Sequence, residues 1–276
     1  GSSMAFLPSG SIPYQQYVLG DTASLASLLR AKGYDTLAFH PGERTSWQRD
    51  RAYPRLGFDD FKCGEDMDVP QTEEHGYVSD DSDFEQIIWE FEHKDESTPL
   101  FLFNVTIQNH GSYTVEDYPA EVQLTDEPGA YPKAEQYLTL ANKTDEAFKK
   151  LIDYFSAQTE PTILVMFGDH QPSVEQEFLD KAYGVTQDEM TMAQYMDKFK
   201  VPFIIWANYS LTGDSTKITS LNFLAQYVLR NAGIETSAYG KYLWNLQKTI
   251  PAMTFAGYFD SEGNAYSHLD TTKFTP

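Results

Sequence analysis

An apolar run near the middle of the chain ends abruptly in a glycine, a carboxylate and an imidazole. The run Ile163–Phe167 holds five apolar residues between Pro161 and Gly168, a pattern typical of a strand buried on both faces. Asp169 and His170 follow immediately. Ligands bind at the carboxyl ends of strands in open α/β sheets, and carboxylates and imidazoles are good ligands for divalent cations. The run therefore predicts a metal site at the end of a buried strand.

Helical and strand patterns alternate along the chain up to about residue 235. This alternation predicts one α/β domain over residues 1–276, with a mostly parallel sheet flanked by helices. Residues 41–78 are rich in proline, glycine and charge and predict irregular structure, whereas residues 257–266 predict an antiparallel hairpin within a β-rich extension over about 236–276. The expected helices are 22–32, 82–93 (opened by a capping box of Ser82 and Glu85), 132–158 and 221–231, and the expected strands are 34–40, 99–107, 161–167 and 201–207.

Polar residues follow three of the expected strands. Strand 34–40 ends at His40, strand 99–107 runs into Gln108, Asn109 and His110, and strand 161–167 runs into Asp169 and His170. If the three strands are parallel, their carboxyl ends share one edge of the sheet. A single histidine after a strand is often a loop-stabilising hydrogen bonder, but a carboxylate after a buried strand is costly without a cation or donors. Their convergence predicts a site more strongly than any one motif.

Charge and composition exclude several classes of binding partner and structure. The net charge of −21 argues against nonspecific nucleic-acid binding. No apolar stretch approaches the roughly 18 residues needed to span a bilayer. The single cysteine, Cys63, excludes an internal disulfide framework and a cysteine-rich zinc site.

Four of the six arginines fall within twelve residues. A guanidinium matches the geometry of a phosphate or carboxylate, so the cluster predicts an oxyanion site; the alternative is a solvated loop that pairs with Asp50, Asp59 and Asp60. Trp47 lies inside the cluster and either packs locally or stacks on a polyol. The remaining histidines, His75, His93 and His268, have acidic or exposed contexts and no expected role. The clustered arginines are Arg44, Arg49, Arg51 and Arg55.

Five segments together resemble the lipoteichoic acid synthase family, whose members are phosphoglycerol transferases of the alkaline phosphatase and sulfatase superfamily. Order and approximate spacing both match, over about residues 5–235. The resemblance implies an alkaline phosphatase/sulfatase-like fold and an extracellular catalytic domain, normally anchored to the bacterial plasma membrane by upstream helices. The segments are Phe39-His40, Ser46-Trp47-Gln48-Arg49-Asp50, Gly57-Phe58-Asp59-Asp60-Phe61, Thr106-Ile107-Gln108-Asn109-His110 and Phe167-Gly168-Asp169-His170.

The resemblance also implies a reaction. Family members transfer glycerol phosphate from phosphatidylglycerol to a polymer or glycolipid, through a threonine-linked intermediate. The family metal, Mn²⁺ or Mg²⁺, is held by an Asp-His pair that matches Asp169 and His170, together with a glutamate and the nucleophilic threonine. His110 matches an active-site histidine that contacts the phosphoglycerol group, Trp47 and Arg49 match its substrate-binding residues, and His40 matches a further histidine beside them.

By the family spacing, the glutamate and the threonine fall before residue 1. We therefore expect this chain to be the C-terminal part of a catalytic domain, inactive alone and weak in binding Mn²⁺. Three alternatives stay open. A sulfatase needs arginine where the segment starting at Ser11 ends in Gln15; a phosphatase or phosphodiesterase of the same superfamily is the second; a noncatalytic binder of anionic polyols, acting through Trp47, Arg49 and His110, is the third.

Overall fold

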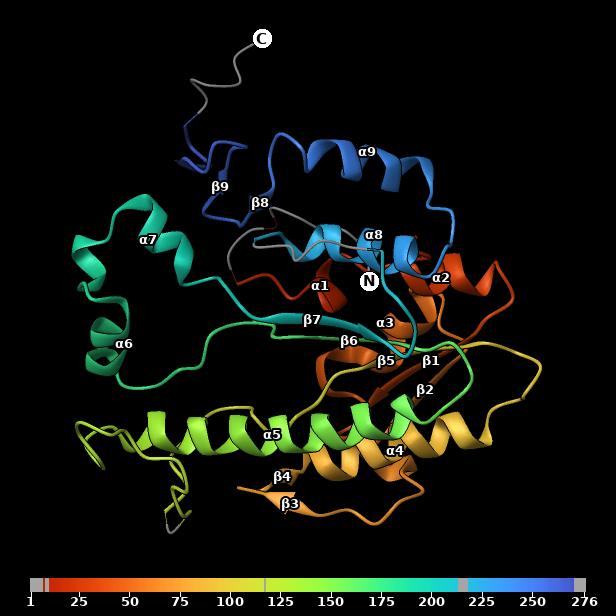
Figure 1. Ribbon diagram of the computed structural model, residues 1–276, viewed down its shortest axis with the longest axis horizontal. Helices are drawn as coiled ribbons and strands as arrows, with labels where there is room; N and C mark the ends of the chain where they lie inside the picture. The colour runs from red at the N-terminus through yellow and green to blue at the C-terminus, as the bar shows by residue number, and fades with distance from the viewer. Residues whose placement is uncertain (1–6, 8–9, 117, 213–217, 271–276) are drawn as a thin grey trace. The chain divides into compact units, whose positions relative to one another are not determined.

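The computed structural model describes residues 7, 10–116, 118–212 and 218–270 (Figure 1). These residues form two compact units. The first contains residues 11–116, 118–154 and 172–178, and the second contains residues 7, 10, 155–171, 179–212 and 218–270. The single domain expected over residues 1–276 stays a prediction.

A parallel sheet of three strands forms the centre of the first unit. The strands are β1 (Asp35–His40), β2 (Asp60–Cys63) and β5 (Leu100–Asn104), in the order β2-β1-β5 with both pairings parallel. Five of the six β1 residues are buried, as expected for a strand paired on both edges. The predicted α/β class with a parallel sheet is confirmed, although the strand expected over 99–107 ends at Asn104.

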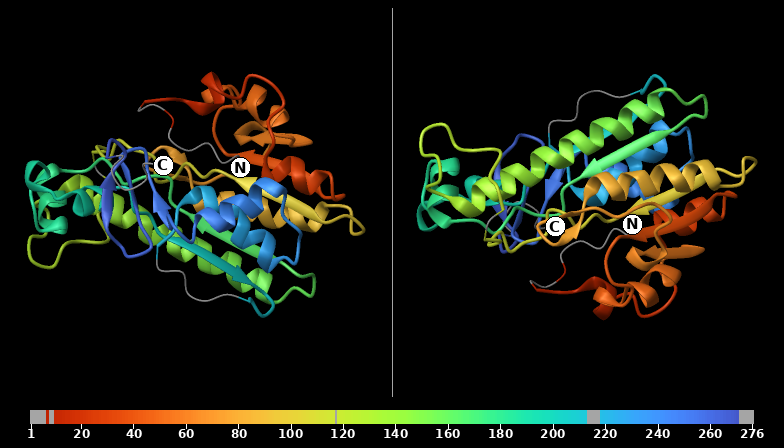
Figure 2. Two further views of the ribbon diagram at one scale, coloured as in Figure 1. Left: turned by 90° about the horizontal axis from the view of Figure 1, so that it is seen from above. Right: turned by 90° about the horizontal axis from the view of Figure 1, so that it is seen from below.

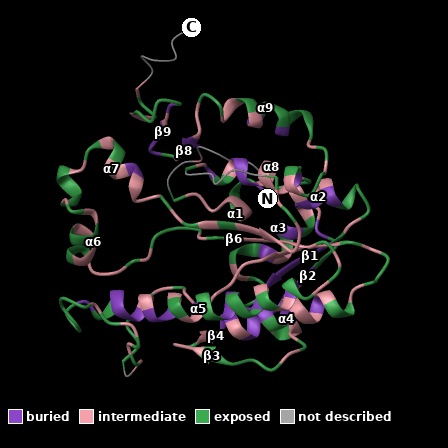
Figure 3. Ribbon diagram, viewed as in Figure 1, coloured by how far each residue is buried: buried purple, intermediate pink, exposed green. Residues whose placement is uncertain are grey.

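Helices flank this sheet. α4 and α5 lie side by side (Figures 1 and 2), where the rings of Phe84 and Phe148 are 6.3 Å apart. A second aromatic cluster is centred on the fully buried Tyr53 of α3, whose ring is 4.9 Å from that of Phe61. Figure 3 shows buried residues in β1 and β2 and along α4 and α5. The helices are α1 (Pro13–Gln16), α2 (Leu25–Arg30), α3 (Arg49–Arg55), α4 (Asp80–His93) and α5 (Pro132–Ser156).

Two predictions about local structure are wrong. The helix expected to open at Ser82 begins at Asp80, because the Ser79 side chain accepts from the backbone N–H of Ser82 and acts as the N-cap. Residues 41–78 are not wholly irregular, since they contain ordered elements that Pro54 and several glycines obscure in the sequence. These elements are α3, β2, the hairpin β3 (Glu73–Glu74) and β4 (Tyr77–Val78), and 3₁₀ turns at Ser46–Gln48 and Gly64–Asp66.

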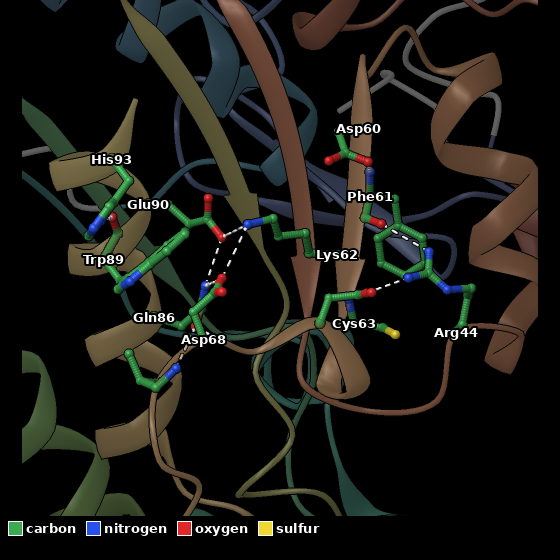
Figure 4. Close-up of polar contacts among 12 residues, drawn as sticks. Arg44, Asp60, Phe61, Lys62, Cys63, Asp68, Gln86, Trp89, Glu90 and His93 are labelled. Atoms are coloured by element: carbon green, nitrogen blue, oxygen red, sulfur yellow. Dashed lines mark hydrogen bonds and ion pairs between the residues drawn. The ribbon is translucent and has the colours of Figure 1, made fainter. Parts of the chain in front are cut away.

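An ion-pair network ties the segment after β2 to α4 (Figure 4). The Lys62 ammonium lies 2.6 Å from a Glu90 carboxylate oxygen, and Gln86 donates to the same carboxylate at 2.7 Å. The Gln86 side-chain oxygen in turn accepts from the backbone N–H of Asp68 at 2.8 Å. Glu90 is 9% exposed, so this network is held in a partly desolvated setting and fixes the path of the chain toward the β3–β4 hairpin.

The second unit contains antiparallel sheets. β6 (Ile163–Phe167) pairs antiparallel with β7 (Phe203–Ala207) in a sheet of two strands. The expectation of a fully buried strand is wrong, because Ile163 to Met166 are half-buried and Phe167 is 39% exposed. The condition that all three site-bearing strands be parallel partners in one sheet is met by β1 and β5 and not by β6. The helices are α6 (Gln176–Tyr183), α7 (Met192–Asp197), α8 (Leu221–Asn231) and α9 (Ala238–Leu246), with a 3₁₀ turn at Gln187–Glu189.

The predicted C-terminal hairpin is confirmed. β9 (Gly257–Phe259) and β10 (Ala265–Ser267) are antiparallel, and β8 (Ala252–Met253) adds a third strand in the order β10-β9-β8. Asp260 holds the connecting turn, accepting from the backbone N–H groups of Glu262 and Asn264 at 2.9 Å.

Candidate active site

His40 lies at the carboxyl end of β1 and is 2% exposed. Its Nδ1–H donates to the carbonyl of Val105 at 2.7 Å; a carbonyl only accepts, so this contact fixes the proton on Nδ1. Burial is the main cause that lowers the pKa of His40 to about 4; the hydrogen bond to Val105 opposes this shift, and the charges of Arg49 and His110 add to it. The imidazole is therefore neutral near pH 7 and keeps a lone pair on Nε2.

Gly42 packs directly against this free nitrogen. A Cβ atom placed on Gly42 would lie 2.5 Å from His40 Nε2 and 3.1 Å from its Cδ2. Carbon and nitrogen do not approach that closely without displacement, so the ring position depends on the absence of a side chain here.

Trp47 and Gln48 share an unusual backbone conformation. Both are left-handed, with φ of 58° and 56°, a region that non-glycine residues adopt at an energetic cost and that clusters at ligand sites. This turn ends the 3₁₀ segment Ser46–Gln48 and opens α3 at Arg49. As a result, the Trp47 indole is 50% exposed while Arg49, two residues later, is 8% exposed.

Arg49 is a buried cation without an anion. One terminal nitrogen donates to the carbonyl of Ser46 at 3.2 Å, and Nε is buried with no hydrogen-bond partner. No carboxylate in the described part of the chain forms an ion pair with it. A buried guanidinium in this state is poised to accept a phosphate or carboxylate.

The other clustered arginines have structural partners or are exposed. Arg44 pairs with Asp66 and lies over the Phe61 ring (Figure 4), and Arg55 donates to the carbonyl of Val18 at 2.9 Å. Arg51 is exposed. Arg44 thus belongs to a paired loop, although its partner is Asp66 and not Asp50, Asp59 or Asp60. The oxyanion site at Arg49 stays a prediction.

His110 lies in the turn that follows β5. It is exposed, and its Nδ1–H donates to the carbonyl of Gly111 at 2.7 Å, which leaves Nε2 with the lone pair. The preceding Gln108 is 1% exposed and anchors the turn. Its side-chain oxygen accepts from the backbone N–H of Asp80 at 2.9 Å, and its amide nitrogen donates to the Thr144 hydroxyl at 3.2 Å.

The first unit therefore brings together three of the predicted site residues. His40, Arg49 and His110 are near enough that the charges of the latter two act on His40. Trp47 stands beside Arg49 in sequence at the opening of α3. Lone pairs at two imidazole Nε2 atoms and an unpaired guanidinium suit a small anion that carries hydroxyl groups.

Asp169 and His170 lie in the second unit, in the turn after β6. Their side chains are 83% and 76% exposed, and Asp169 Oδ2 is 3.4 Å from His170 Nε2. The His170 Nδ1–H donates to the carbonyl of Gln171 at 2.9 Å, which leaves Nε2 as the ring nitrogen on the side of the carboxylate. A carboxylate oxygen and an imidazole nitrogen are ligand types that suit a divalent metal.

The pair supplies two ligands. Among the described residues, no group of three or more histidine, cysteine, aspartate or glutamate side chains is arranged to hold a metal ion. The predicted roles of Asp169 and His170 therefore stay predictions, as do the roles of His40, Trp47, Arg49 and His110.

Comparison with known proteins identifies the family. A model described as "Sulfatase" matches residues 2–234. The chain belongs to the sulfatase family. This match confirms the superfamily resemblance read from the sequence motifs, and it covers both the first unit and the Gly-Asp-His turn.

Two curated relatives match most of this chain. A "Putative cyclic beta-1,2-glucan modification protein" of Rhizobium meliloti is 33% identical over 254 residues, which is 88% of this chain and 38% of that protein. The "Lipoteichoic acid synthase" of Staphylococcus aureus is 24% identical over 245 residues, which is 86% of this chain and 36% of that protein. The chain thus spans little more than a third of the length of these two relatives.

Solved structures confirm the fold. The phosphoglycerol transferase GacH of Streptococcus pyogenes, in complex with sn-glycerol-1-phosphate, superposes with a TM-score of 0.72 at 18% identity, covering 90% of this chain and 64% of that one. The lipoteichoic acid synthase LtaP of Listeria monocytogenes gives 0.67 at 18% identity, covering 98% and 74%. Within the described residues, no helix has both the length and the apolar character to cross a membrane.

The sequence analysis assigns no role to His75, yet its Nε2 lies 2.6 Å from the carbonyl of Gln108, close to His110. His75 and Gly76, with φ of 37° and 93°, form a two-residue hairpin turn between short strands. A glycine in such a turn is a sequence signal for a hairpin, but the surrounding charge and proline obscure it here.

Proposed function

We propose that this sulfatase-family domain transfers glycerol phosphate to a cell-envelope polymer or glycolipid. The donor is a phosphatidylglycerol-type lipid headgroup, and the protein that contains the domain is anchored at the extracellular face of the bacterial plasma membrane. The observation that carries the proposal is the buried guanidinium of Arg49, without an anion, near His40 and His110. Relatives named for lipoteichoic acid synthesis and a similar fold solved with sn-glycerol-1-phosphate support it.

Each residue has a role that follows from its setting. Arg49 binds the phosphoryl oxygens and stabilises the charge that builds on them in the transition state. His40, neutral and holding a lone pair on Nε2, accepts a hydrogen bond from a glycerol hydroxyl. Trp47 covers the glycerol carbons with its exposed indole. His110 has its lone pair on Nε2, because Nδ1–H is committed to the carbonyl of Gly111; it therefore takes up a proton at Nε2 before it can give one to the leaving oxygen.

Asp169 and His170 would hold the metal, Mn²⁺ or Mg²⁺, through Oδ2 and Nε2. When bound, a divalent ion lowers the pKa of a coordinated hydroxyl and offsets negative charge on phosphoryl oxygens. The reaction that the family resemblance implies forms a threonine-linked glycerol phosphate.

An experiment can decide which of two polymers accepts the glycerol phosphate. The curated relative with the higher identity is named for modification of a cyclic β-1,2-glucan, whereas the other is named for lipoteichoic acid synthesis. We therefore propose a glucan as an acceptor to be tried beside a glycerol phosphate polymer. Transfer of label from phosphatidylglycerol to one acceptor and not to the other, catalysed by the full-length gene product, distinguishes them.

Calorimetric titration of glycerol 1-phosphate into this chain tests recognition. We expect Arg49→Ala to weaken binding by about 10-fold or more, since a charged hydrogen bond is lost. Arg51→Ala is the matched control, because Arg51 lies in the same helix but is exposed, and it should bind like the parent chain. Absence of binding at millimolar ligand, or equal loss in both variants, contradicts the proposal.

Turnover separates the transferase from its competitors. The full-length gene product should release diacylglycerol from phosphatidylglycerol in the presence of Mn²⁺ or Mg²⁺. Hydrolysis of an aryl sulfate would indicate a sulfatase, and hydrolysis of a simple phosphate ester without transfer would indicate a phosphatase or phosphodiesterase. Glycerol phosphate binding with no turnover of any of these would indicate a noncatalytic binder.

A further inference from the structure

A small hairpin lies against the turn that carries His110. The strands β3 (Glu73–Glu74) and β4 (Tyr77–Val78) are joined by the two-residue turn of His75 and Gly76. The left-handed φ of both turn residues matches the tight hairpin turn that fits strand twist. Two side chains of this hairpin reach the segment 108–111.

His75 holds the backbone before His110. Its Nε2–H donates to the carbonyl of Gln108 at 2.6 Å, and because a carbonyl only accepts, Nε2 must carry the proton. The imidazole is packed among tyrosines, with ring centroids 5.2 Å from Tyr77, 6.0 Å from Tyr118 and 6.4 Å from Tyr113. Packing against these rings thus holds the Nε2–H of His75 toward the carbonyl of Gln108.

Tyr77 holds the ring of His110 and the backbone after it. Its hydroxyl lies 3.4 Å from His110 Nδ1 and 3.4 Å from the carbonyl of Gly111. That carbonyl is the same one that accepts from His110 Nδ1–H. The Tyr77 ring meets the imidazole edge-on, with centroids 5.7 Å apart. Both contacts engage the Nδ1 side and leave Nε2 free.

The hairpin has its own supports on other elements. Glu74 accepts from the Tyr118 hydroxyl at 2.7 Å and lies 3.3 Å from the ammonium of Lys143, which belongs to α5. Thr72, just before β3, donates its backbone N–H to the hydroxyl oxygen of Ser82 in α4 at 2.8 Å. Because the hairpin is bonded to both α4 and α5, it can fix the position of the His110 side chain.

We propose that the β3–β4 hairpin is a clamp that positions the His110 ring and the carbonyl of Gly111, and that this carbonyl, held in place, selects the His110 tautomer. His75 fixes the backbone on one side and Tyr77 fixes the imidazole and the carbonyl on the other, so that Nδ1 carries the proton and Nε2 faces the substrate. His75 and Tyr77 are positioning residues, since neither is required to touch the substrate. This inference rests on the proposed function, because the proposed function is what assigns proton transfer to Nε2 of His110.

Nitrogen-15 NMR of the histidine rings in this chain tests the clamp directly, without activity. We expect the parent chain to show His110 as the Nδ1–H tautomer. Tyr77→Phe removes one oxygen and keeps the ring, and we expect it to mix the two tautomers. Tyr118→Phe is the matched control: it removes a hydroxyl from the same aromatic cluster, but that hydroxyl bonds Glu74 and not the segment 108–111, and Glu74 keeps its ion pair with Lys143, so the His110 signals should stay as in the parent.

His75 variants test the backbone contact. His75→Gln retains an N–H donor and should keep the parent His110 spectrum, whereas His75→Phe retains an aromatic ring without a donor and should not. If His75→Phe fails to fold, Tyr77→Phe alone decides. An unchanged tautomer in Tyr77→Phe, or the same change in Tyr118→Phe, overturns the clamp.

Kinetics in the full-length gene product connect the clamp to the reaction. We expect Tyr77→Phe to lower kcat by about 10- to 100-fold with KM for the donor within twofold, because misplacement of a proton-transfer group affects the transition state. Equal loss in Tyr118→Phe would show a structural effect and overturn the role. If the parent protein neither binds glycerol phosphate nor turns over the lipid, the proposed function fails, while the NMR result still decides the clamp.

Discussion

Two groups of predicted site residues, one in each unit, differ in how firmly their side chains are held. In the first unit, His40 and Arg49 are 2% and 8% exposed, and the turn before His110 is bonded to α4 and α5 through Gln108. In the second unit, the side chains of Asp169 and His170 are 83% and 76% exposed. The first region is ordered by its protein contacts, whereas the second presents two ligand atoms with little packing around them.

This difference indicates that the side chains of the first group are positioned before a ligand binds, whereas those of the second group depend on a ligand for their position. Anion recognition at Arg49 rests on groups already positioned by burial, so binding there requires little reorganisation. Asp169 and His170 are exposed, so a metal bound through Oδ2 and Nε2 would fix their geometry more than protein packing does. A substitution at Asp169 should therefore lower activity and leave stability unchanged, whereas a substitution at Arg49 should lower both.

The largest expected effect comes from the exposed region. In the full-length gene product, we expect Asp169→Asn to lower transfer by about 1,000-fold or more, because a lost metal ligand removes charge stabilisation of the phosphoryl group. The free energy of unfolding should change by less than about 0.5 kcal/mol, as for other exposed substitutions. Transfer assays and chemical denaturation of the same samples measure the two quantities.

Glu177→Gln is a control for Asp169→Asn, since it removes another carboxylate from the first turn of α6 without touching the Gly-Asp-His turn. Retained transfer in Asp169→Asn would exclude a metal role for this carboxylate. A loss of stability above about 1 kcal/mol would show that the turn is structural after all.

The second effect tests the buried region. We expect Arg49→Lys to lower transfer by about 100-fold, because an ammonium does not reproduce the planar fork that binds two phosphoryl oxygens. Unlike Asp169→Asn, it should also lower stability, since the shorter and more strongly hydrated cation stays buried. Activity close to that of the parent would show that Arg49 acts as a point charge only.

The sequence predicted the fold class better than the placement of individual strands. Helix–strand alternation and buried runs such as β1 correctly indicated an α/β fold with parallel strands. The run Ile163–Phe167 was misjudged because five consecutive apolar residues are consistent with either sheet type, and only the pairing partner decides. Its partner is β7, which runs antiparallel, a long-range choice that no local pattern encodes.

The sequence predicts the residue types of a site, whose roles stay predictions, but not the contacts that support them. Three of the predicted residues lie in the first unit, where the charges of Arg49 and His110 act on His40. The left-handed Trp47 and Gln48, the glycine packed on His40 and the clamp at His75 are consequences of tertiary packing. They depend on contacts between residues far apart in the chain, which neither composition nor periodicity contains.

The third effect concerns pH and the burial of His40. Its pKa is about 4 in the folded chain against an ordinary value of 6.5, so between these values the unfolded chain binds more protons and stability rises with pH. We expect a loss of up to about 3 kcal/mol as pH falls from 6.5 to 4, taking about 1.4 kcal/mol for each pKa unit. Chemical denaturation at several pH values measures it.

Another buried group acts in the opposite sense. Burial raises the pKa of Asp80 to about 6, so its contribution to stability falls as pH rises through that range. The useful quantity is therefore the difference between the parent and His40→Gln, in which the His40 contribution disappears and that of Asp80 remains. A difference that does not vary between pH 4 and 6.5 would show that His40 titrates normally.

The smallest expected effect tests how closely the buried region is packed. We expect Gly42→Ala to lower the free energy of unfolding by about 1 to 2 kcal/mol, because the added Cβ would lie 2.5 Å from His40 Nε2 and must displace the ring. The same displacement should weaken glycerol 1-phosphate binding. Gly20→Ala is the matched control, since a Cβ there meets nothing within 4 Å. Equal stability in both variants would mean that the His40 ring is free to move, and the contrast with the exposed Asp169–His170 pair would then rest on Arg49 alone.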